Sequence, residues 1–263
     1  LGIRLAHVEA GLRSFDWTMP EEINRIVTDR LSEILLTPSP DADENLRREG
    51  VPPERIHRVG NIMIDALVAH LAKAERSDVL ARFGLRPKSY AVLTLHRPSN
   101  VDDAARLEGI LGAILRVSRE LPVVFACHPR TSQRLQANAA WRRDRGEGRV
   151  LETEPLGYLD FLRLTSQSRL VLTDSGGLQE ETTYLGIPCV TIRENTERPI
   201  TVTEGTNVLA GTDPGAIERA ALEAISGRGR RGRVPDLWDG RTAPRIAEVF
   251  ARWWERRGRS GPE

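Results

Sequence analysis

The sequence predicts an α/β protein with two Rossmann-like parallel-sheet domains that flank an interdomain cleft. Short apolar runs alternate with longer amphipathic stretches along the 263 residues. Strands that alternate with helices form parallel sheets with crossover helices, so each alternating series predicts one domain. A charged stretch at residues 82–88 separates two such series. We therefore expect a first domain at residues 1–84, a second at residues 85–235, and a C-terminal helix within residues 236–263 that packs at the domain boundary.

The first series contains three strand patterns and three helix patterns. A helix is predicted from about Pro20, because apolar residues recur at helical spacing after it. Gly50 then ends a short polar helix, as glycine often does. The expected elements are a strand at Ile3–Val8, the helix whose apolar face is Ile23, Ile26, Val27, Leu31 and Ile34, a short strand and turn at Leu35–Pro40, helices at Asp41–Glu49 and Ile64–Ala74, and a strand at Ile56–Asn61.

The second series repeats the alternation with longer helices. The expected strands are Ala91–Leu95, Val123–Cys127, Val150–Leu151, Leu170–Leu172 and Ile187–Ile192, and the expected helices are Ala104–Leu121, Ser132–Ala140, Leu159–Gln167, Leu178–Leu185 and, at the end, Ala243–Arg256.

Composition excludes several classes of protein. The formal net charge is +1, which gives no electrostatic case for nucleic acid as a partner. No apolar run reaches the length of a membrane span, and no secretory signal opens the chain, so we expect no membrane partner. Cys127 and Cys189 are too few for a disulfide framework, which favours a reducing, cytoplasmic setting.

The stretch Thr173–Gly177, T-D-S-G-G, stands between a strand pattern and a helix pattern. A helix N-terminus with glycines favours anions, because its free N–H groups lie open to a phosphate. Glu181, one turn further on, could accept hydrogen bonds from a ribose. The alternative is an ordinary N-cap by Asp174 or Ser175, with Glu180 and Glu181 complementing the helix dipole. Both interpretations remain open from this motif alone.

Two carboxylates are candidates for proton transfer. Glu9 follows the first strand, at the strand end where α/β sites gather, and burial there could raise its pKa. The alternative is an ion pair between Glu9 and Arg13. Glu21 could point into the cleft, but Thr18 and Glu21 also match a capping box, which needs no catalytic role.

Histidine–arginine pairs follow two neighbouring strands. His96 and Arg97 come after one strand, and His128 with Arg130 after the next. Such pairs suggest a rim that binds a polyanion. A metal site is the rival interpretation, but no spacing of His or Cys supports it, so we expect none. The pattern G-x-G-x-x-G at Gly227–Gly232 follows no strand and is rejected as a dinucleotide motif.

Two further segments could contact a nucleotide. Arg198 could bind a phosphate or pair with Glu197. The segment from Leu156 to Phe161 puts exposed backbone beside an aromatic ring, which suits a base, although Phe161 could equally be helix core.

Taken together, the motifs HVEAGLRS, MPEEINR, HRPSN, EPLGYLDF, TDSGGLQEE and NTERPITVTEGTNVL resemble the non-hydrolysing UDP-N-acetylglucosamine 2-epimerases over almost the whole chain. The resemblance implies a GT-B-like fold and a homodimer. It also implies interconversion of UDP-GlcNAc and UDP-ManNAc without NAD or metal, so no cofactor is expected, in the supply of surface-polysaccharide precursors.

By this resemblance the reaction is an elimination of UDP followed by its re-addition, which requires carboxylates at the sugar and firm phosphate binding. The implied catalytic residues are Glu9, Glu21 and His96. The implied substrate contacts are Ser175, Gly176 and Gly177 to the diphosphate, Glu181 to the ribose, Arg198 to a phosphate, and Leu156 and Phe161 to the uracil, with Arg97 and His128 on the anion-binding rim.

The sequence also departs from the family pattern. The family's first strands, with a basic segment and a catalytic aspartate, are absent, and Ile200 stands where many members have Glu. We therefore expect an N-terminal domain that is incomplete and a catalytic set that lacks a member. The alternatives are a hydrolysing 2-epimerase, a relative that acts on a modified UDP-sugar, a GT-B glycosyltransferase and a non-catalytic UDP-sugar-binding fragment.

Overall fold

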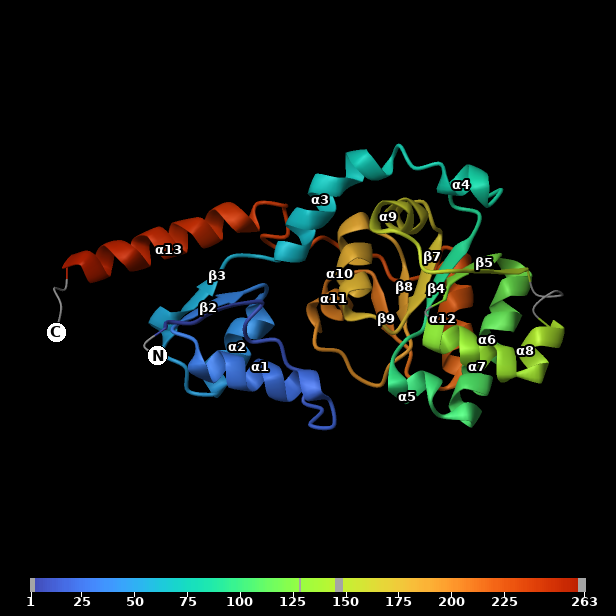
Figure 1. Cartoon of the computed structure of the whole chain (residues 1–263), viewed down its shortest axis with the longest axis horizontal. Helices are drawn as coiled ribbons and strands as arrows, with labels where there is room; N and C mark the ends of the chain where they lie inside the picture. Colours follow the sequence, from blue (N-terminus) through green and yellow to red (C-terminus); the bar gives the residue numbers. More distant parts are fainter. Residues whose placement is uncertain (1–2, 128, 145–148, 260–263) are drawn as a thin grey trace. The chain divides into compact units, whose positions relative to one another are not determined.

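The computed structural model describes residues 3–127, 129–144 and 149–259 (Figure 1). Its contacts divide the chain into two compact units. Unit 1 comprises Leu1–Ala69, Glu197–Ile200 and Pro235–Glu263, and unit 2 comprises His70–Thr196 and Thr201–Val234. The first division therefore falls before the expected boundary at residue 84, and the C-terminal helix belongs to unit 1. The α/β class of parallel sheets is confirmed in both units.

Unit 1 is built on a parallel sheet that runs β1-β2-β3 in its described residues. Successive side chains of the middle strand point to opposite faces, as the strand period requires. Leu35 packs with Leu46 on one face, and Leu36 packs with Ile246 and Val249 on the other. The elements are β1 (Ala6–Val8), α1 (Pro20–Leu31), β2 (Ile34–Thr37), α2 (Pro40–Arg48), η1 (Pro53–Arg55), β3 (Ile56–Arg58) and α13 (Thr242–Arg259), while α3 (Ile62–Ala74) and α11 (Ile200–Thr203) each contain a boundary between the units.

Helix α1 reverses the expected burial pattern. Its apolar residues Ile23, Val27 and Leu31 are 46%, 51% and 68% exposed. The buried residues of α1 are instead the acids Glu22 and Asp29. The apolar face predicted for this helix is therefore not its buried face at these residues, because α1 is held by hydrogen bonds that its two buried carboxylates accept from backbone N–H groups.

Unit 2 is built on a longer parallel sheet. In the part of unit 2 that the structure describes, the strand order is β6-β5-β4-β7-β8-β9. The chain first adds strands on one side of β4, then returns to place β7 on the other side (Figure 1). The elements are α4 (Val79–Arg82), β4 (Ala91–Thr94), α5 (Pro98–Val101), α6 (Ala104–Glu120), β5 (Val123–Ala126), α7 (Pro129–Ala137), α8 (Ala139–Asp144), β6 (Val150–Thr153), α9 (Tyr158–Ser166), β7 (Leu170–Thr173), α10 (Gly176–Leu185), β8 (Cys189–Thr191), β9 (Asn207–Leu209) and α12 (Pro214–Ile225).

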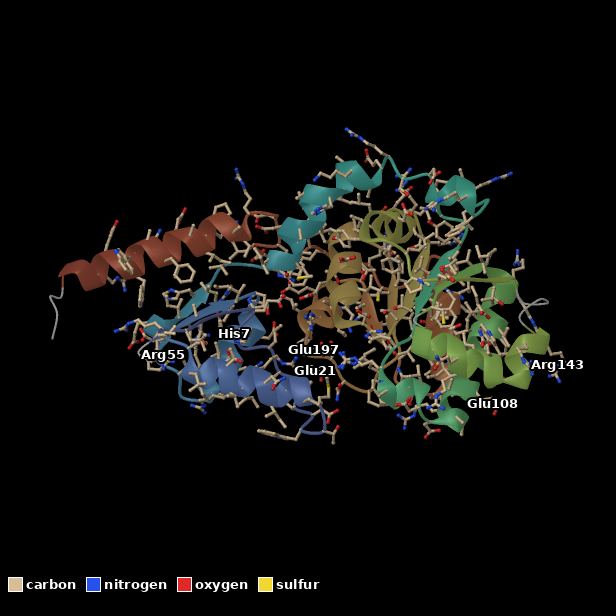
Figure 2. The ribbon with its side chains drawn as sticks, viewed as in Figure 1. His7, Glu21, Arg55, Glu108, Arg143 and Glu197 are labelled. Carbon is tan, nitrogen blue, oxygen red and sulfur yellow. The ribbon has the colours of Figure 1, made fainter. Side chains whose placement is uncertain are left out.

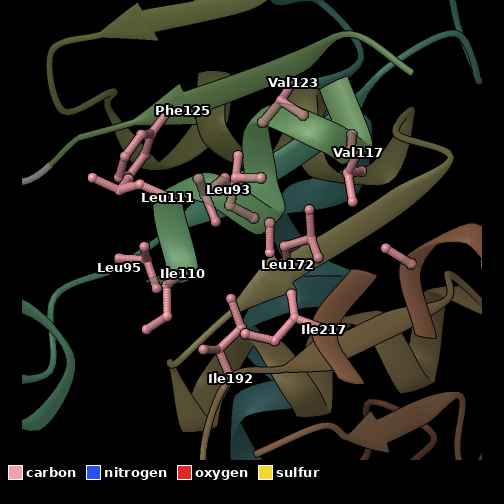
Figure 3. Packing of buried hydrophobic residues seen from close by; sticks show 14 of the residues in the cluster. Leu93, Leu95, Ile110, Leu111, Val117, Val123, Phe125, Leu172, Ile192 and Ile217 are labelled. Atoms are coloured by element: carbon pink, nitrogen blue, oxygen red, sulfur yellow. The ribbon is translucent and has the colours of Figure 1, made fainter. Parts of the chain in front are cut away.

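Both faces of the unit 2 sheet are covered by helices. Leu93 of β4 points to the face covered by α6 and α12, where it belongs to one apolar cluster with Ile110 and Ile217 (Figure 3). The neighbouring Val92 points to the other face and packs with Leu164 of α9. This burial on both faces explains the continuous apolar strands in the sequence. The rigid sheet fixes the loops at its carboxyl edge, where the candidate site lies.

Candidate functional site

The strand order places the switch point of the unit 2 sheet between β4 and β7. In doubly wound sheets, ligands bind outside the carboxyl ends of the strands at this point. The two strands are in register up to Thr94 and Thr173, whose hydroxyl oxygens lie 2.6 Å apart. His96 follows β4 and Ser175 follows β7, so residues that are distant in the sequence meet at one edge of the sheet.

Asp174 joins these two loops. Its carboxylate is fully buried and accepts hydrogen bonds from the backbone N–H groups of His96 (3.0 Å) and Arg97 (2.9 Å) and from the side chain of Asn100 (3.2 Å). Burial alone raises the pKa of Asp174, but its bonds with His96 and Arg97 bring it below its ordinary value. The sequence suggested only an N-cap for this residue, so its role was missed. A buried acid directly after an apolar strand was the available signal.

The same carboxylate also orients the ring of His96. The Nδ1 atom of His96 lies 2.8 Å from Asp174, and the histidine side chain is 46% exposed. An ionised acid next to Nδ1 favours the tautomer with its proton there, which leaves Nε2 for a ligand. His96 is thus a fixed, accessible imidazole at the switch point.

Helix α10 begins without a side-chain cap. Ser175 is the N-cap residue, but its side chain makes no capping hydrogen bond, and Asp174 bonds to the β4 loop instead. The alternative interpretation as an ordinary cap is therefore not what the structure shows. A Cβ atom added at Gly177 would meet no atom within 4 Å, so the fold itself does not require glycine there. The first N–H groups of α10 have the character of an anion site.

Glu181 lies one turn into α10 and is 8% exposed. Burial, with a smaller contribution from the charge of Glu180, raises the pKa of Glu181 to about 7. The charge of Glu181 in turn helps burial to raise the pKa of Tyr158. Glu181 is therefore a desolvated carboxyl group. Hydroxyl groups that donate hydrogen bonds to it stabilise its charged form.

Two further predicted contacts of unit 2 lie at α9 and in the segment before it. Leu156 and Phe161 are partly buried and pack against the apolar cluster of Leu164. His128 lies outside the described residues.

A cavity of about 520 Å³ opens at the ends of β5 and β6 and is lined by Cys127, Ser132, Glu152, Thr153, Glu154 and Pro155. Burial and the charge of Glu152 raise the pKa of Cys127 to about 12, so this thiol is no nucleophile.

Glu9 lies in a strained turn at the end of β1 in unit 1. Its φ angle is 69°, in the left-handed region that costs a residue other than glycine about 1–2 kcal/mol. Its Oε1 atom is buried and makes no hydrogen bond within the described residues. Arg13 does not pair with Glu9, since it pairs with Asp29 and Glu49 instead. The ion pair considered from the sequence is therefore not formed.

Glu21 is exposed in the first turn of α1 (Figure 2). The predicted capping box is not formed, because Met19 is the N-cap residue and the Thr18 hydroxyl donates to Asp16 at 2.6 Å. The neighbouring Glu22 is buried and accepts bonds from Ser14 and Phe15, a structural role that the sequence did not reveal. The two adjacent acids thus face different surroundings.

Arg198 donates to the carboxylate of Glu197 at 2.6 Å, one of the two roles considered for it. Both residues belong to the short segment that groups with unit 1. Among the described residues, no group of three or more His, Cys, Asp or Glu side chains could hold a metal ion.

Two parallel-sheet units, one with an uncapped helix N-terminus at its switch point, define an α/β protein of the GT-B-like class. The sequence model of the family described as UDP-N-acetylglucosamine 2-epimerase matches residues 1–251. The chain belongs to this family, and the resemblance seen in the sequence is confirmed.

Relatives from archaea and bacteria extend this comparison. UDP-N-acetylglucosamine 2-epimerases are 43% identical over 81% of this chain in Methanococcus maripaludis and 40% identical over 95% in Methanocaldococcus jannaschii. A UDP-2,3-diacetamido-2,3-dideoxy-D-glucuronate 2-epimerase of Pseudomonas aeruginosa is 38% identical over 96%. The chain spans 60%, 69% and 69% of the lengths of these three relatives.

A solved structure of the Methanocaldococcus jannaschii UDP-GlcNAc 2-epimerase, in complex with UDP-GlcNAc and UDP, superposes with a TM-score of 0.85. It is 41% identical, and the match covers 95% of this chain and 69% of that one. The fold of this chain is therefore that of a UDP-GlcNAc 2-epimerase over nearly all of its length.

Proposed function

We propose that the protein is a UDP-N-acetylglucosamine 2-epimerase that interconverts UDP-GlcNAc and UDP-ManNAc. The observation that carries this proposal is the open N-terminus of α10 beside His96, whose ring is oriented by Asp174. An uncapped helix N-terminus suits a diphosphate, and an adjacent imidazole can assist its departure. The similarity to an epimerase that binds UDP-GlcNAc and UDP supports the same ligand here.

The nucleotide contacts follow from the chemistry of the described side chains. In this proposal Ser175, Gly176 and Gly177 bind the diphosphate, and Glu181 accepts hydrogen bonds from the ribose. Leu156 and Phe161 contact the uracil, while Arg97, Arg198 and His128 contribute positive charge or hydrogen bonds to the phosphates. The uracil contact is supported by the partial exposure of Leu156 and Phe161 on the edge of an apolar cluster.

The carboxylates Glu9 and Glu21 act on the hexose. One removes the C2 proton while the bond between C1 and the UDP oxygen breaks, which gives a 2-acetamidoglucal and UDP. A proton then returns to C2 on the opposite face, and UDP adds again at C1. Tight diphosphate binding retains the departed UDP during this interval, so the sugar is not released.

A modified substrate is the second candidate. The Pseudomonas aeruginosa relative, named for a UDP-2,3-diacetamido-2,3-dideoxy-D-glucuronate, covers 96% of this chain and is nearly as similar as the N-acetylglucosamine enzymes. The nucleotide contacts described above do not touch C3 or C6 of the sugar, so they serve both substrates.

We further propose a cytoplasmic homodimer that supplies polysaccharide precursors. None of the described helices has the length and apolar character of a membrane span.

Incubation with each UDP-sugar in D₂O distinguishes these candidates. We expect UDP-ManNAc and UDP-GlcNAc that carry deuterium at C2, observed by NMR, with no free sugar and no added NAD or metal. Deuterium in the diacetamido glucuronate alone would favour the second candidate, and release of free ManNAc would favour a hydrolysing enzyme. UDP binding without exchange in either sugar would contradict the epimerase proposal and indicate a binding fragment. Light scattering measures whether the chain is a dimer.

A further inference from the structure

We propose that Asp29 is a positioning residue for Glu9, whose carboxylate it holds in place through the turn after β1. The inference rests on the proposed function, in which Glu9 is a catalytic carboxylate. Asp29 lies near the end of α1, is 1% exposed, and was not among the residues that the sequence singled out.

The carboxylate of Asp29 contacts the chain on both sides of Glu9. Its Oδ1 atom lies 2.5 Å from Nδ1 of His7, which stands two residues before Glu9. Its Oδ2 atom accepts a hydrogen bond of 3.1 Å from the backbone N–H of Gly11, two residues after Glu9. A single side chain therefore fixes both ends of the turn.

The opposite side of this turn is closed by backbone. The N–H of Ala10 donates to the carbonyl oxygen of Leu36 at 3.1 Å. Gly11 has a φ of +80°, and a Cβ atom there would lie 2.3 Å from the carbonyl oxygen of Ala42. The turn is thus held between β2 and α2 on one side and Asp29 on the other. The left-handed φ of Glu9 persists because its surroundings impose it.

A buried guanidinium strengthens the contact. Arg13 is 2% exposed and lies 2.7 Å from Asp29 and 2.7 Å from Glu49. Burial alone lowers the pKa of Arg13, but Glu49 and Asp29 raise it above its ordinary value. The bond between Arg13 and Asp29 is therefore charge-assisted, which restricts the carboxylate to one orientation.

A positioning role and a merely structural role differ in their kinetic effects. Apart from Arg198, the proposed nucleotide contacts lie in unit 2, and none of them touches Asp29 in the described residues, so loss of Asp29 leaves the affinity for UDP unchanged in a folded protein. A displaced Glu9 carboxylate instead lowers kcat with little effect on KM, because the lost interaction acts at the reacting carbon. A general loss of structure would change both parameters.

The test compares Asp29→Ala and Asp29→Asn with Glu49→Gln as the matched control. Glu49 is the other acid on Arg13, and among the described residues its side chain bonds to Arg13 alone. We expect Asp29→Ala to lower the kcat for C2 deuterium exchange at least about 100-fold, since a displacement of about 1 Å can cost that much. Asp29→Asn, which keeps the side-chain shape, should lower kcat about 10-fold. The kcat of Glu49→Gln should stay within about 3-fold of the wild-type value. KM, measured in the same exchange assay, should change less than about 3-fold in all variants, and so should the affinity for UDP, measured by calorimetry.

Crystal structures of the two Asp29 variants give a readout that does not depend on turnover. We expect the φ angle of Glu9 to leave the left-handed region, and Asp29→Asn serves if Asp29→Ala does not fold. Exchange that is absent in the wild type would contradict the proposed function, and the variant structures would still decide the role of Asp29. The inference is overturned if Glu9 keeps its φ in both variants, or if Glu49→Gln loses as much kcat as Asp29→Ala.

Discussion

At the scale of single residues, the open backbone at Gly177 carries the most specific consequence. The fold leaves room for a side chain there, so packing does not require glycine, and in the proposed function the diphosphate does. Alanine is the better helix former by about 1 kcal/mol, so the residue present is unfavourable for the helix alone.

Gly177→Ala should therefore separate binding from folding. We expect the free energy of unfolding to stay equal or rise by up to about 1 kcal/mol, because alanine favours the helix. The affinity for UDP should fall at least about 10-fold, because the methyl group keeps the phosphate from the N–H groups. Urea denaturation and calorimetric titration measure the two quantities.

Gly112→Ala provides the control, since Gly112 lies within α6, where the nearest contact of a Cβ atom is the Arg116 side chain at 3.5 Å. It should raise helix stability in the same way without altering UDP affinity. Equal UDP affinity in Gly177→Ala and the wild type would contradict a diphosphate site at α10.

Glu181 makes stability depend on pH. Its folded-state pKa is raised from an ordinary 4.5 to about 7, so between these values the folded protein binds more protons than the unfolded one. The unfolding free energy therefore falls as pH rises from about 4.5 to 7, by about 3 kcal/mol at most. Glu181→Gln should remove this fall, so the variant gains stability relative to the wild type between pH 5 and pH 8. Urea denaturation at both values measures the gap, and a gap that does not change with pH would contradict this assignment.

At the scale of elements, α1 shows how side-chain burial can oppose the sequence pattern. Its acids Glu22 and Asp29 point inward to backbone N–H groups, while Val27 points outward. The backbone bonds and the Arg25 partner bring the pKa of Glu22 below its ordinary value despite its burial. The helix is therefore attached by polar contacts that an apolar periodicity cannot reveal.

We expect Glu22→Ala to lower the unfolding free energy by about 2–3 kcal/mol, because it leaves the N–H groups of Ser14 and Phe15 without acceptors. Val27→Gln, on the exposed side of the same helix, should change it by less than about 0.5 kcal/mol. Thermal or urea unfolding of the two variants gives the comparison. A larger loss in Val27→Gln than in Glu22→Ala would show that the apolar side of α1 is buried in solution.

Strands β1 to β8 and most of the longer helices could be predicted from the sequence, because both faces of the inner strands β4, β5, β7 and β8 are buried and glycine ends several elements. Strand β9 and helix α12 were not predicted. The helix from Pro20 was also predicted correctly, although its orientation was not. The sequence suggested only a capping role for Asp174, because the N–H groups that donate hydrogen bonds to it belong to a loop 78 positions away. Asp29 was not recognised for the same reason, because its partners His7 and Gly11 belong to another element. Such roles depend on tertiary contacts, which local patterns do not encode.

At the scale of the whole molecule, the two units should respond differently to nucleotide. We expect UDP at about 100 times its dissociation constant to stabilise the unit that binds it by about 2.7 kcal/mol. Hydrogen exchange should then slow at residues 174–181 and in β4 and β7, with a smaller change in β2 of unit 1. If hydrogen exchange slowed only in unit 1, the proposed nucleotide site in unit 2 would be contradicted.

The hydrogen bonds between Asp174 and the loop after β4 have a consequence for folding. Strand β7 pairs with the edge of β4 that faces away from β5, and the two bonded loops lie 78 positions apart in the sequence, so their contact is a non-local one that forms slowly. The proposed diphosphate site therefore requires that both halves of the sheet have met. During refolding, the capacity to bind UDP should return in the slowest phase, so the ligand recognises only chains that have completed this docking.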